Sequence, residues 1–394
     1  MSRTGLPTPA PAVWSAHTGE PSDAPAAGTC EDLVVTETRR ARARDLGVIP
    51  DSLPPGEHNA ITDVAGVRVG HVTLVEGSDV RTGVTAIVHD GLTGAKSLNA
   101  GLAVGNGYGK IVGTTQLGEL GVIETPVVLT GTLSTFRAAD ALVSFMLSLP
   151  GNKRLETVNP VVAETNDGFL SDMRRRPVTA EHVLAALNGA EPGPVGEGAV
   201  GAGTGTGALG YKAGIGTSSR IVNCGAASGP VTIGALVQTN FTGLLTVLGV
   251  PVPPEPAKNP HAPATVGTTP LNTDEPGNSC VIVLATDAPL DSRRLGRVAW
   301  RSIIGMARTG SDFSGHSGDY ALAFSTAPAG AEPVPDSALD PLFVAAIDVA
   351  EEAILNSLFM AATVAGFRGH VRQAVPLDRV LRLCSARGVL RARD

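Results

Sequence analysis

Short apolar runs rich in β-branched residues recur along the chain, and Gly, Pro, Asn or Asp residues bound most of them. Runs of this length and composition are typical of buried strands. Residues 61–72 predict strands around a turn. Single strands are expected directly after Ser279 and over residues 84–89, 124–130, 160–168, 220–224, 231–240 and 321–325.

Apolar residues at helical spacing mark a second class of segment. Residues 134–149 predict a helix with Phe136, Leu142, Val143 and Met146 on one side. Further helices are expected over residues 39–46, over 179–188 with Thr179 as cap, from Asp291 or Ser292 to about residue 307, and over 340–366, with a helix or strand over 377–384. Strands thus come in groups with helices between them. This order favours an α+β sandwich, with helices outside a double sheet, over a doubly wound sheet.

Three stretches lack either pattern or interrupt it. Residues 1–33 are rich in Pro, Ala, Ser and Thr, so we expect a disordered tail before a single domain over residues 34–394. Residues 196–207 are dense in glycine but lack the Gly-Lys-Ser/Thr ending of a phosphate loop, which indicates close-packed backbone or a pocket wall. The apolar run 342–366 contains Asp348, Glu351 and Glu352, which favours a buried helix over a membrane span.

Composition narrows the class of protein. The 394 residues are 43% hydrophobic and 17% charged, as in an ordinary soluble globular protein. Aromatic residues make up only 4% and the net charge is −7, which argues against nucleic-acid binding. Residues 1–22 contain no apolar segment typical of a secretory signal, so a cytoplasmic location is expected. The four cysteines form no CxxC pair, and no clustered ligands indicate a metal site.

Ser279 stands at the boundary between a polar loop and an apolar segment. A loop rich in Pro, Asn and Thr, residues 251–277, precedes it, and a buried strand follows it. We hypothesise that the Ser279 hydroxyl attacks the Asn278 carbonyl and cuts the chain into fragments 1–278 and 279–394. The new α-amine, with a reference pKa of about 8, would then serve as the base for the adjacent hydroxyl. Position alone is also compatible with a plain serine at the start of a core strand.

Several segments in order resemble one family. Residues 278–290 resemble the nucleophile segment of the DmpA-type aminopeptidases, which include L-aminopeptidase/D-esterases, β-aminopeptidases and nylon-oligomer hydrolases. Residues 59–71 resemble the opening strand of this family, and residues 234–241 resemble its oxyanion segment. An acidic substrate-binding turn and a support region are matched by residues 160–172, 307–310 and 315–319. The resemblance covers roughly residues 43–387.

The resemblance implies a role for each matching residue. Ser279 matches the nucleophile, Ser317 and Asp319 match the pair that holds and tunes it, and Asn240 matches the amide that donates to the oxyanion. Glu164 matches the carboxylate that receives the free amino group of the substrate. The family implies a four-layer αββα sandwich of the N-terminal-nucleophile type, shared with ornithine acetyltransferases. It further implies short peptide, amide or ester substrates, no cofactor, and a homo-oligomer, commonly a tetramer of cleaved pairs.

Three positions depart from the family pattern. Asn278 replaces the Gly of the L-aminopeptidase/D-esterase branch, and an Asn-Ser bond can also break through a side-chain imide. Asn166 stands where some members carry a tyrosine thought to assist the oxyanion, and Gly131 stands where an Asn is usual. Alternatives to a peptidase are acetyl transfer of the ornithine acetyltransferase type, nylon-oligomer hydrolysis, and a non-catalytic relative that keeps the fold for binding.

Overall fold

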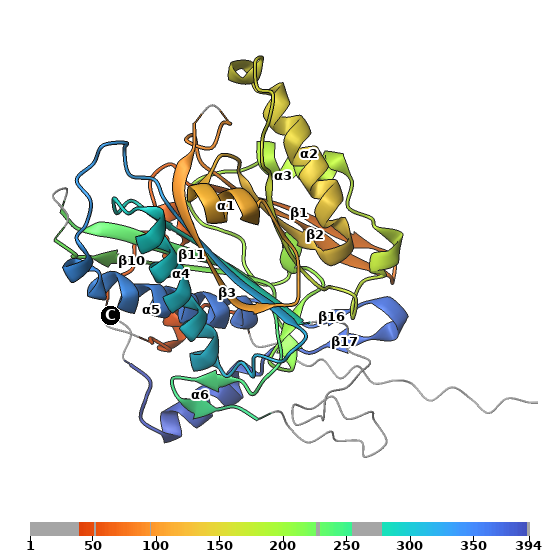
Figure 1. Cartoon of the computed structure of the whole chain (residues 1–394). Helices are drawn as coiled ribbons and strands as arrows, with labels where there is room; N and C mark the ends of the chain where they lie inside the picture. The colour runs from red at the N-terminus through yellow and green to blue at the C-terminus, as the bar shows by residue number, and fades with distance from the viewer. Residues whose placement is uncertain (1–38, 51–52, 95, 226–228, 254–277, 392–394) are drawn as a thin grey trace, which may run out of the picture. The chain divides into compact units, whose positions relative to one another are not determined.

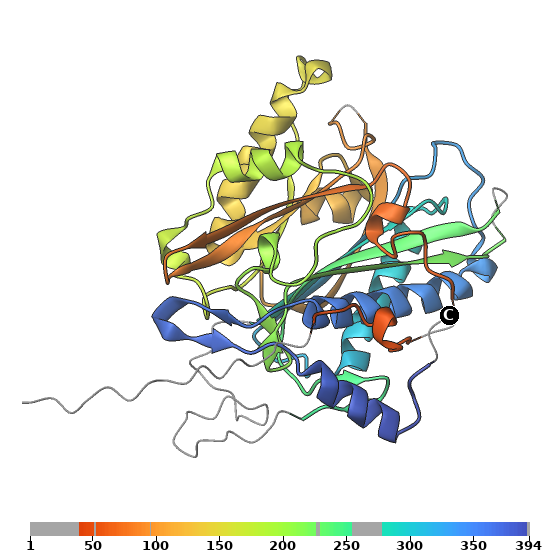
Figure 2. The same ribbon diagram turned by 180° about the vertical axis from the view of Figure 1, so that it is seen from behind.

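The structure is a computed structural model that describes residues 39–50, 53–94, 96–225, 229–253 and 278–391. These residues belong to one compact unit, Thr38–Asp394. The expected tail over residues 1–33 and most of the loop 251–277 lie outside the described residues. Figures 1 and 2 show the unit from opposite sides.

The first sheet has five strands in the order β1-β2-β6-β7-β4. β1 and β2 form an antiparallel hairpin, and β6 runs parallel to β7. The strands are β1 (Arg68–Glu76), β2 (Val80–Val88), β4 (Ile111–Val112), β6 (Val127–Gly131) and β7 (Val161–Thr165).

The second sheet has six strands in the order β10-β11-β14-β15-β3-β5. Its central strand β14 is antiparallel to β11 and parallel to β15. The strands are β3 (Leu98–Gly107), β5 (Val122–Ile123), β10 (Ile215–Val222), β11 (Val231–Asn240), β14 (Asn278–Thr286) and β15 (Ser317–Ser325).

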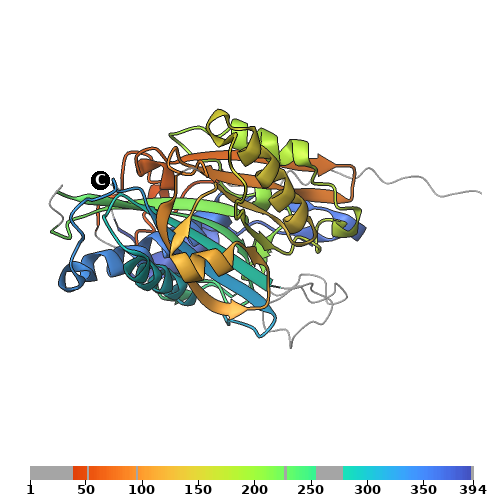
Figure 3. The same cartoon turned by 45° about the horizontal axis from the view of Figure 1, so that its top comes forward.

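Helices cover the outer face of each sheet, which gives four layers (Figure 3). α2 (Thr135–Ser148) and α3 (Ala180–Asn188) lie on the five-stranded sheet, and α4 (Ser292–Thr309) and α5 (Asp340–Phe359) lie on the six-stranded one. Separate apolar clusters fill the two helix–sheet interfaces and the space between the sheets. The predicted α+β sandwich is therefore confirmed.

Smaller elements complete the unit. They are α1 (Thr114–Leu120), α6 (Leu377–Ala386), and the two-stranded ribbons β8–β9 (Gly207–Ala208 and Tyr211–Lys212), β12–β13 (Thr246–Val247 and Val250–Pro251) and β16–β17 (Val364–Ala365 and Val371–Arg372).

Four sequence-based assignments need correction, and one strand was not predicted. Residues 61–72 contain a 3-10 helix, Ile61–Asp63, before a single strand, and the helix expected over 39–46 is only the 3-10 turn Arg44–Leu46. The helix predicted over 340–366 ends at Phe359. Phe136, expected on the packed side of α2, is 68% exposed. The Gly-rich stretch that follows residue 98 is a ten-residue strand, β3.

Close packing explains why the pattern of apolar residues does not predict β3. A Cβ atom at Gly101 would lie 2.2 Å from the backbone nitrogen of Gly296 in α4. Glycine is thus required for the helix to approach this strand, although glycine weakens the strand signal.

The buried acidic residues of α5 are all paired with arginines, as burial of charged groups requires. Glu352 is fully buried and pairs with the equally buried Arg220 at 2.5 Å and with Arg44 at 2.9 Å. Glu351 and Asp348 both pair with Arg308. No helix within the described residues combines the length and the apolar character needed to cross a membrane.

Candidate active site

The strand register gathers five of the predicted residues at the ends of three adjacent strands of the six-stranded sheet. β11 ends at Asn240, whose register partner is Ser279 near the start of β14. Asn278 pairs with Ser317, and Cys280 pairs with Asp319 on the parallel neighbour β15. Residues from three distant parts of the chain therefore lie side by side on adjacent strands.

The peptide bond between Asn278 and Ser279 is firmly held. The Ser279 side chain is buried, and its Oγ donates to the carbonyl oxygen of Asn278 at 2.5 Å. The Asn278 side-chain amide donates to Ser314 Oγ at 2.9 Å and to Thr242 Oγ1 at 3.1 Å, and its backbone N–H donates to the His316 carbonyl. The hydroxyl thus rests against the carbonyl group that self-cleavage would attack.

Ser317 and Asp319 form a buried pair on β15. Ser317 Oγ donates to Asp319 Oδ1 at 2.7 Å, and Asp319 Oδ2 has no hydrogen-bond partner in the described part of the chain. Burial raises the pKa of Asp319 to about 6, although the Ser317 hydroxyl and the Cys280 amide oppose the shift. This carboxyl therefore changes charge near neutral pH, in the range where a group can both accept and release a proton.

Asn240 is oriented by a backbone donor. Its Oδ1 accepts from the N–H of Gly207 at 3.2 Å. Because a side-chain amide carries its oxygen and its NH2 group at separate corners, a bond to the oxygen sets the direction of the donor. This is the requirement for an amide that must meet a developing oxyanion.

Glu164 already holds an ammonium group. Its carboxylate is buried, and Oε1 accepts from the backbone N–H and from Nζ of Lys110, at 3.0 and 3.1 Å. The pKa of Tyr320 is raised, mainly by burial and further by the negative charges of Glu164 and Asp319. Both carboxylates therefore lie near the Tyr320 side chain. In the structure, the carboxylate expected to receive a substrate amine is thus occupied by the ammonium of Lys110.

A glutamine connects the two sheets behind the site. Gln238 of β11 donates from Nε2 to Thr165 Oγ1 at 2.9 Å and to the Thr130 carbonyl at 3.3 Å. It therefore ties the ends of β6 and β7, where Glu164 lies, to the strand that carries Asn240.

Lys110 and Gln238 were not predicted from the sequence. A polar residue inside the apolar run 231–240 was a usable signal for Gln238, because buried polar groups require partners. Lys110 gave no signal, since it follows a glycine in a Gly-rich stretch.

The two departures from the family pattern near Glu164 both involve the turn after β7. A Cβ atom at Gly131 would lie 2.5 Å from Asp167 Oδ2, so a side chain at position 131 would require the Asp167 carboxyl to move. Burial raises the pKa of Asp167 to about 6. Asn166 accepts from the Gly168 N–H through Oδ1, which engages its oxygen locally.

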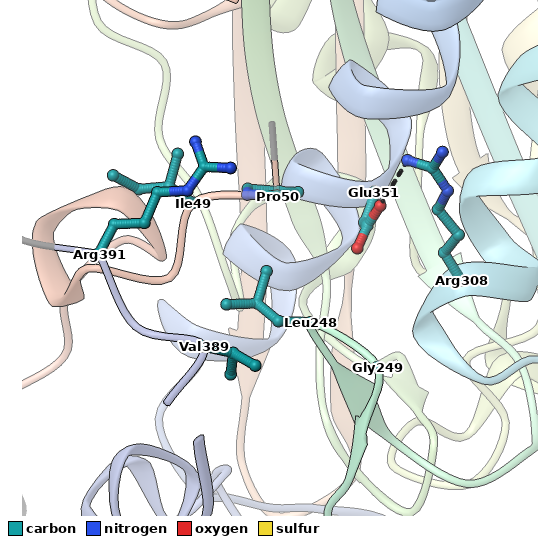
Figure 4. A pocket seen from close by; sticks show the side chains of 8 residues that line it. All are labelled: Ile49, Pro50, Leu248, Gly249, Arg308, Glu351, Val389 and Arg391. Carbon is teal, nitrogen blue, oxygen red and sulfur yellow. Dashed lines mark hydrogen bonds and ion pairs between the residues drawn. The ribbon is translucent and has the colours of Figure 1, made fainter. Parts of the chain in front are cut away.

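A separate surface hollow lies beside α5 and the end of α4 (Figure 4). It contains none of the predicted site residues, and Figure 4 shows Arg308 turned toward Glu351, its ion-pair partner. Its lining consists of Ile49, Pro50, Leu248, Gly249, Arg308, Glu351, Val389 and Arg391. Across the described ranges, no group of three or more His, Cys, Asp or Glu side chains is placed to hold a metal ion.

Comparisons with known proteins identify relatives of this chain. A beta-peptidyl aminopeptidase, BapA, from Sphingosinicella microcystinivorans is 41% identical, with 85% of this chain and 89% of the relative covered. The solved beta-aminopeptidase from Burkholderia sp. is 37% identical with a TM-score of 0.77, and covers 88% of this chain and 99% of its own.

A further solved structure is the L-aminopeptidase D-Ala-esterase/amidase from Ochrobactrum anthropi, described as a variant of the Ntn hydrolase fold. It is 35% identical with a TM-score of 0.77, over 89% of this chain and 99% of its own. The family model for Peptidase family S58 matches residues 59–372. The chain therefore belongs to Peptidase family S58, the family of the DmpA-type aminopeptidases.

Proposed function

We propose that this protein is a self-processing serine aminopeptidase whose nucleophile is Ser279. In the processing step, Ser279 Oγ attacks the Asn278 carbonyl carbon, the C–N bond breaks, and the nitrogen takes up the hydroxyl proton. Water then hydrolyses the resulting ester, which releases the Asn278 carboxylate and restores the Ser279 hydroxyl beside a free α-amine.

The second half of the mechanism uses that amine as a base. It takes the hydroxyl proton as Oγ attacks the carbonyl carbon of a substrate, and the proton passes to the leaving amine. Asn240 donates to the oxyanion, while Ser317 and Asp319 hold the new α-ammonium. Water hydrolyses the acyl-enzyme and completes the turnover.

One observation carries the proposal. The Ser279 hydroxyl lies 2.5 Å from the carbonyl oxygen of the residue before it, on a strand directly flanked by Asn240 and by the Ser317–Asp319 pair. A plain serine at the start of a core strand does not require an oriented amide on one side and a buried acid on the other.

The substrate class follows from Glu164. A buried carboxylate that binds an ammonium selects substrates with an unblocked amino group. The curated relative is named as a beta-peptidyl aminopeptidase, and we extend that preference to this chain. We therefore propose short peptides, amides or esters with a free amine, including those that begin with a β-amino acid.

Intact mass measurement and one assay test the proposal. Purified protein is expected to give two fragments separated at the 278–279 bond, and to hydrolyse aminoacyl p-nitroanilides. Ser279→Ala should remain a single chain without activity, whereas the exposed control Ser148→Ala should cut and turn over normally.

Two outcomes would overturn the proposal. Cleavage that persists in Ser279→Ala would favour the imide route through Asn278, whose side-chain nitrogen is engaged by two hydroxyls in the structure. Acetyl transfer from acetylornithine to glutamate, without release of p-nitroaniline, would assign the chain to acyl transfer instead.

The proposal extends to assembly and location. The family resemblance, which implies an oligomer, and exposed apolar side chains such as Trp300 and Val344 support a homo-oligomer of cleaved pairs. Native mass spectrometry tests the copy number. A cytoplasmic location is tested by fractionation of cells that express the full chain.

A further inference from the structure

We propose that Lys212 is a positioning residue for the oxyanion donor, because its ammonium fixes the hairpin that aims the Asn240 amide. The inference rests on the proposed function, since it assumes that Asn240 donates to the oxyanion. It concerns a residue that neither the sequence motifs nor the mechanism above employ.

Lys212 is an unusual lysine because it is completely buried. Lysine is almost never fully buried unless it is paired. No carboxylate pairs with it among the described residues. Its Nζ instead donates to two backbone carbonyls, at 2.9 Å to that of Gly203 and by a short bond to that of Ala213. Burial and the charge of Arg372 lower its pKa to about 7. A group this costly to bury indicates a specific task.

The two carbonyls belong to segments that meet at the base of one hairpin. Gly203 and Gly214 approach so closely that a Cβ atom at Gly203 would lie 2.6 Å from the Gly214 carbonyl carbon. No side chain fits between the segments, so the lysine ammonium serves as their connection. Without it, the Ala213 carbonyl would lose this donor, and the Gly203 carbonyl would keep only its bonds from the hydroxyl and N–H of Thr206.

The hairpin itself, β8–β9, is held in a strained turn. Its central residues, Leu209 and Gly210, have φ values of 54° and 86°. Positive φ at both positions is the pattern of a type I′ turn. It is costly for leucine, and such strain persists only where surrounding contacts enforce it. Lys212 is the last residue of this hairpin and pairs with Gly207 at its first position.

Three backbone bonds connect the hairpin region to Asn240 and both of its neighbours. The Gly207 N–H donates to Asn240 Oδ1 at 3.2 Å. The Leu209 N–H donates to the Phe241 carbonyl at 2.8 Å, and the Thr239 N–H donates to the Gly214 carbonyl at 3.0 Å. The orientation of the amide therefore depends on the hairpin, and the hairpin is tied at its base by Lys212.

A double-mutant cycle tests this dependence. Lys212→Met keeps the length of the side chain but removes the ammonium, and should lower kcat about 10–100-fold with KM nearly unchanged, which is less than the 100–1000-fold typical for loss of an oxyanion donor. In the Asn240→Ala background, the same change should have almost no further effect, because Lys212 acts through Asn240. The exposed lysine control, Lys153→Met, should be neutral in both backgrounds. Intact mass measurement first shows whether each variant is cut. For a variant that is not cut to completion, the rate of self-cleavage replaces kcat in the same cycle.

The outcomes separate the two proposals. Multiplicative losses in the double variant, or a change confined to KM, would overturn the role of Lys212 while leaving the role of Asn240 intact. Full activity of Asn240→Ala would instead overturn the proposed function at that residue. If Lys212→Met is insoluble, Lys212→Gln takes its place in the cycle. Insolubility of both, beside a soluble Asn240→Ala, would assign Lys212 to folding and overturn the inference.

Discussion

At the scale of single residues, we expect Asp319 to set a pH limit for the proposed self-cleavage. Its pKa in the uncut chain is raised to about 6 by burial, so its carboxyl is protonated below that pH and charged above it. We expect only the charged form to accept the Ser279 hydroxyl proton, through Ser317, and to pass it to the nitrogen released by the cut. The rate of cleavage should therefore fall about tenfold per pH unit below pH 6 and level off above it. To measure this profile, freshly translated chain is transferred to buffers between about pH 5 and pH 8. The rate at which the uncut chain disappears is then followed on gels.

Asp319→Asn supplies the control for this profile. It cannot titrate, so its cleavage should be slow and show no inflection near pH 6. A wild-type rate that is constant across the range, with circular dichroism unchanged, would rule out Asp319 as the titrating group.

Glu164 and Lys110 permit a test of substrate selection. Glu164→Gln removes the charge that binds the substrate amine, and should raise KM about 10–100-fold for aminoacyl p-nitroanilides, because hydrogen bonds to charged groups contribute about 1.5–3 kcal/mol. The matched variant Lys110→Met removes the other half of the ion pair and should not raise KM. Equal increases in both variants would show that the pair acts only as a structural contact.

The residues of the site differ in how far the sequence reveals them. Ser279, Asn240, Ser317 and Asp319 could be proposed because they stand at the ends of strongly patterned strands and within segments that resemble one family. Lys110 could not, because its partner Glu164 lies 54 residues later in the chain, and Lys212 could not, because nothing in the sequence marks the backbone carbonyls of Gly203 and Ala213 as its partners. Lys212 lies among apolar residues, which indicates burial, but only the fold shows the carbonyls that it binds.

At the scale of elements, α5 and β10 are joined by a buried charge network. Glu352 on α5 accepts from Arg220 on β10, from Arg44 and from Asn59. Glu352→Gln leaves the fully buried Arg220 without a matching charge, and should lower the free energy of unfolding by about 3–5 kcal/mol. Urea denaturation of the uncut Ser279→Ala chain, with and without this change, measures the loss.

A paired replacement distinguishes charge from packing. Arg220→Met combined with Glu352→Leu should recover much of the stability, because no unpaired charge remains. A double variant as unstable as Glu352→Gln would indicate that the shape of the network, and not its charge balance, stabilises this interface.

Elements with a regular pattern were easier to predict than those shaped by packing. β11, β14 and α4 follow the apolar pattern of their own residues, and the predicted cap of α4, Asp291, accepts the Arg294 N–H. β3 did not, because its glycines are dictated by the approach of a helix that lies almost two hundred residues later in the chain. The residues of β3 by themselves do not indicate that α4 packs against them.

At the scale of the whole chain, the six-stranded sheet makes separation of the two fragments difficult. β14 and β15, from the fragment that begins at Ser279, lie between β11 and β3 of the other fragment. Each boundary is a full antiparallel ladder, and α4 and α5 pack over the same sheet (Figure 1). The cut lies after the first residue of β14, so it separates only the Asn278–Ser317 pair from the rest of the ladder.

We therefore expect the cut fragments to co-elute in size-exclusion chromatography and to separate only in denaturant. Removal of fragment 279–394 would expose the edges of β11 and β3, and removal of fragment 1–278 would expose those of β14 and β15. Either change also exposes the apolar residues between the layers, which is unfavourable in water. The uncut Ser279→Ala chain serves as the size standard, since it should elute at the same volume. Elution of a free fragment under native conditions would show that the backbone connection, and not the shared sheet, holds the molecule together.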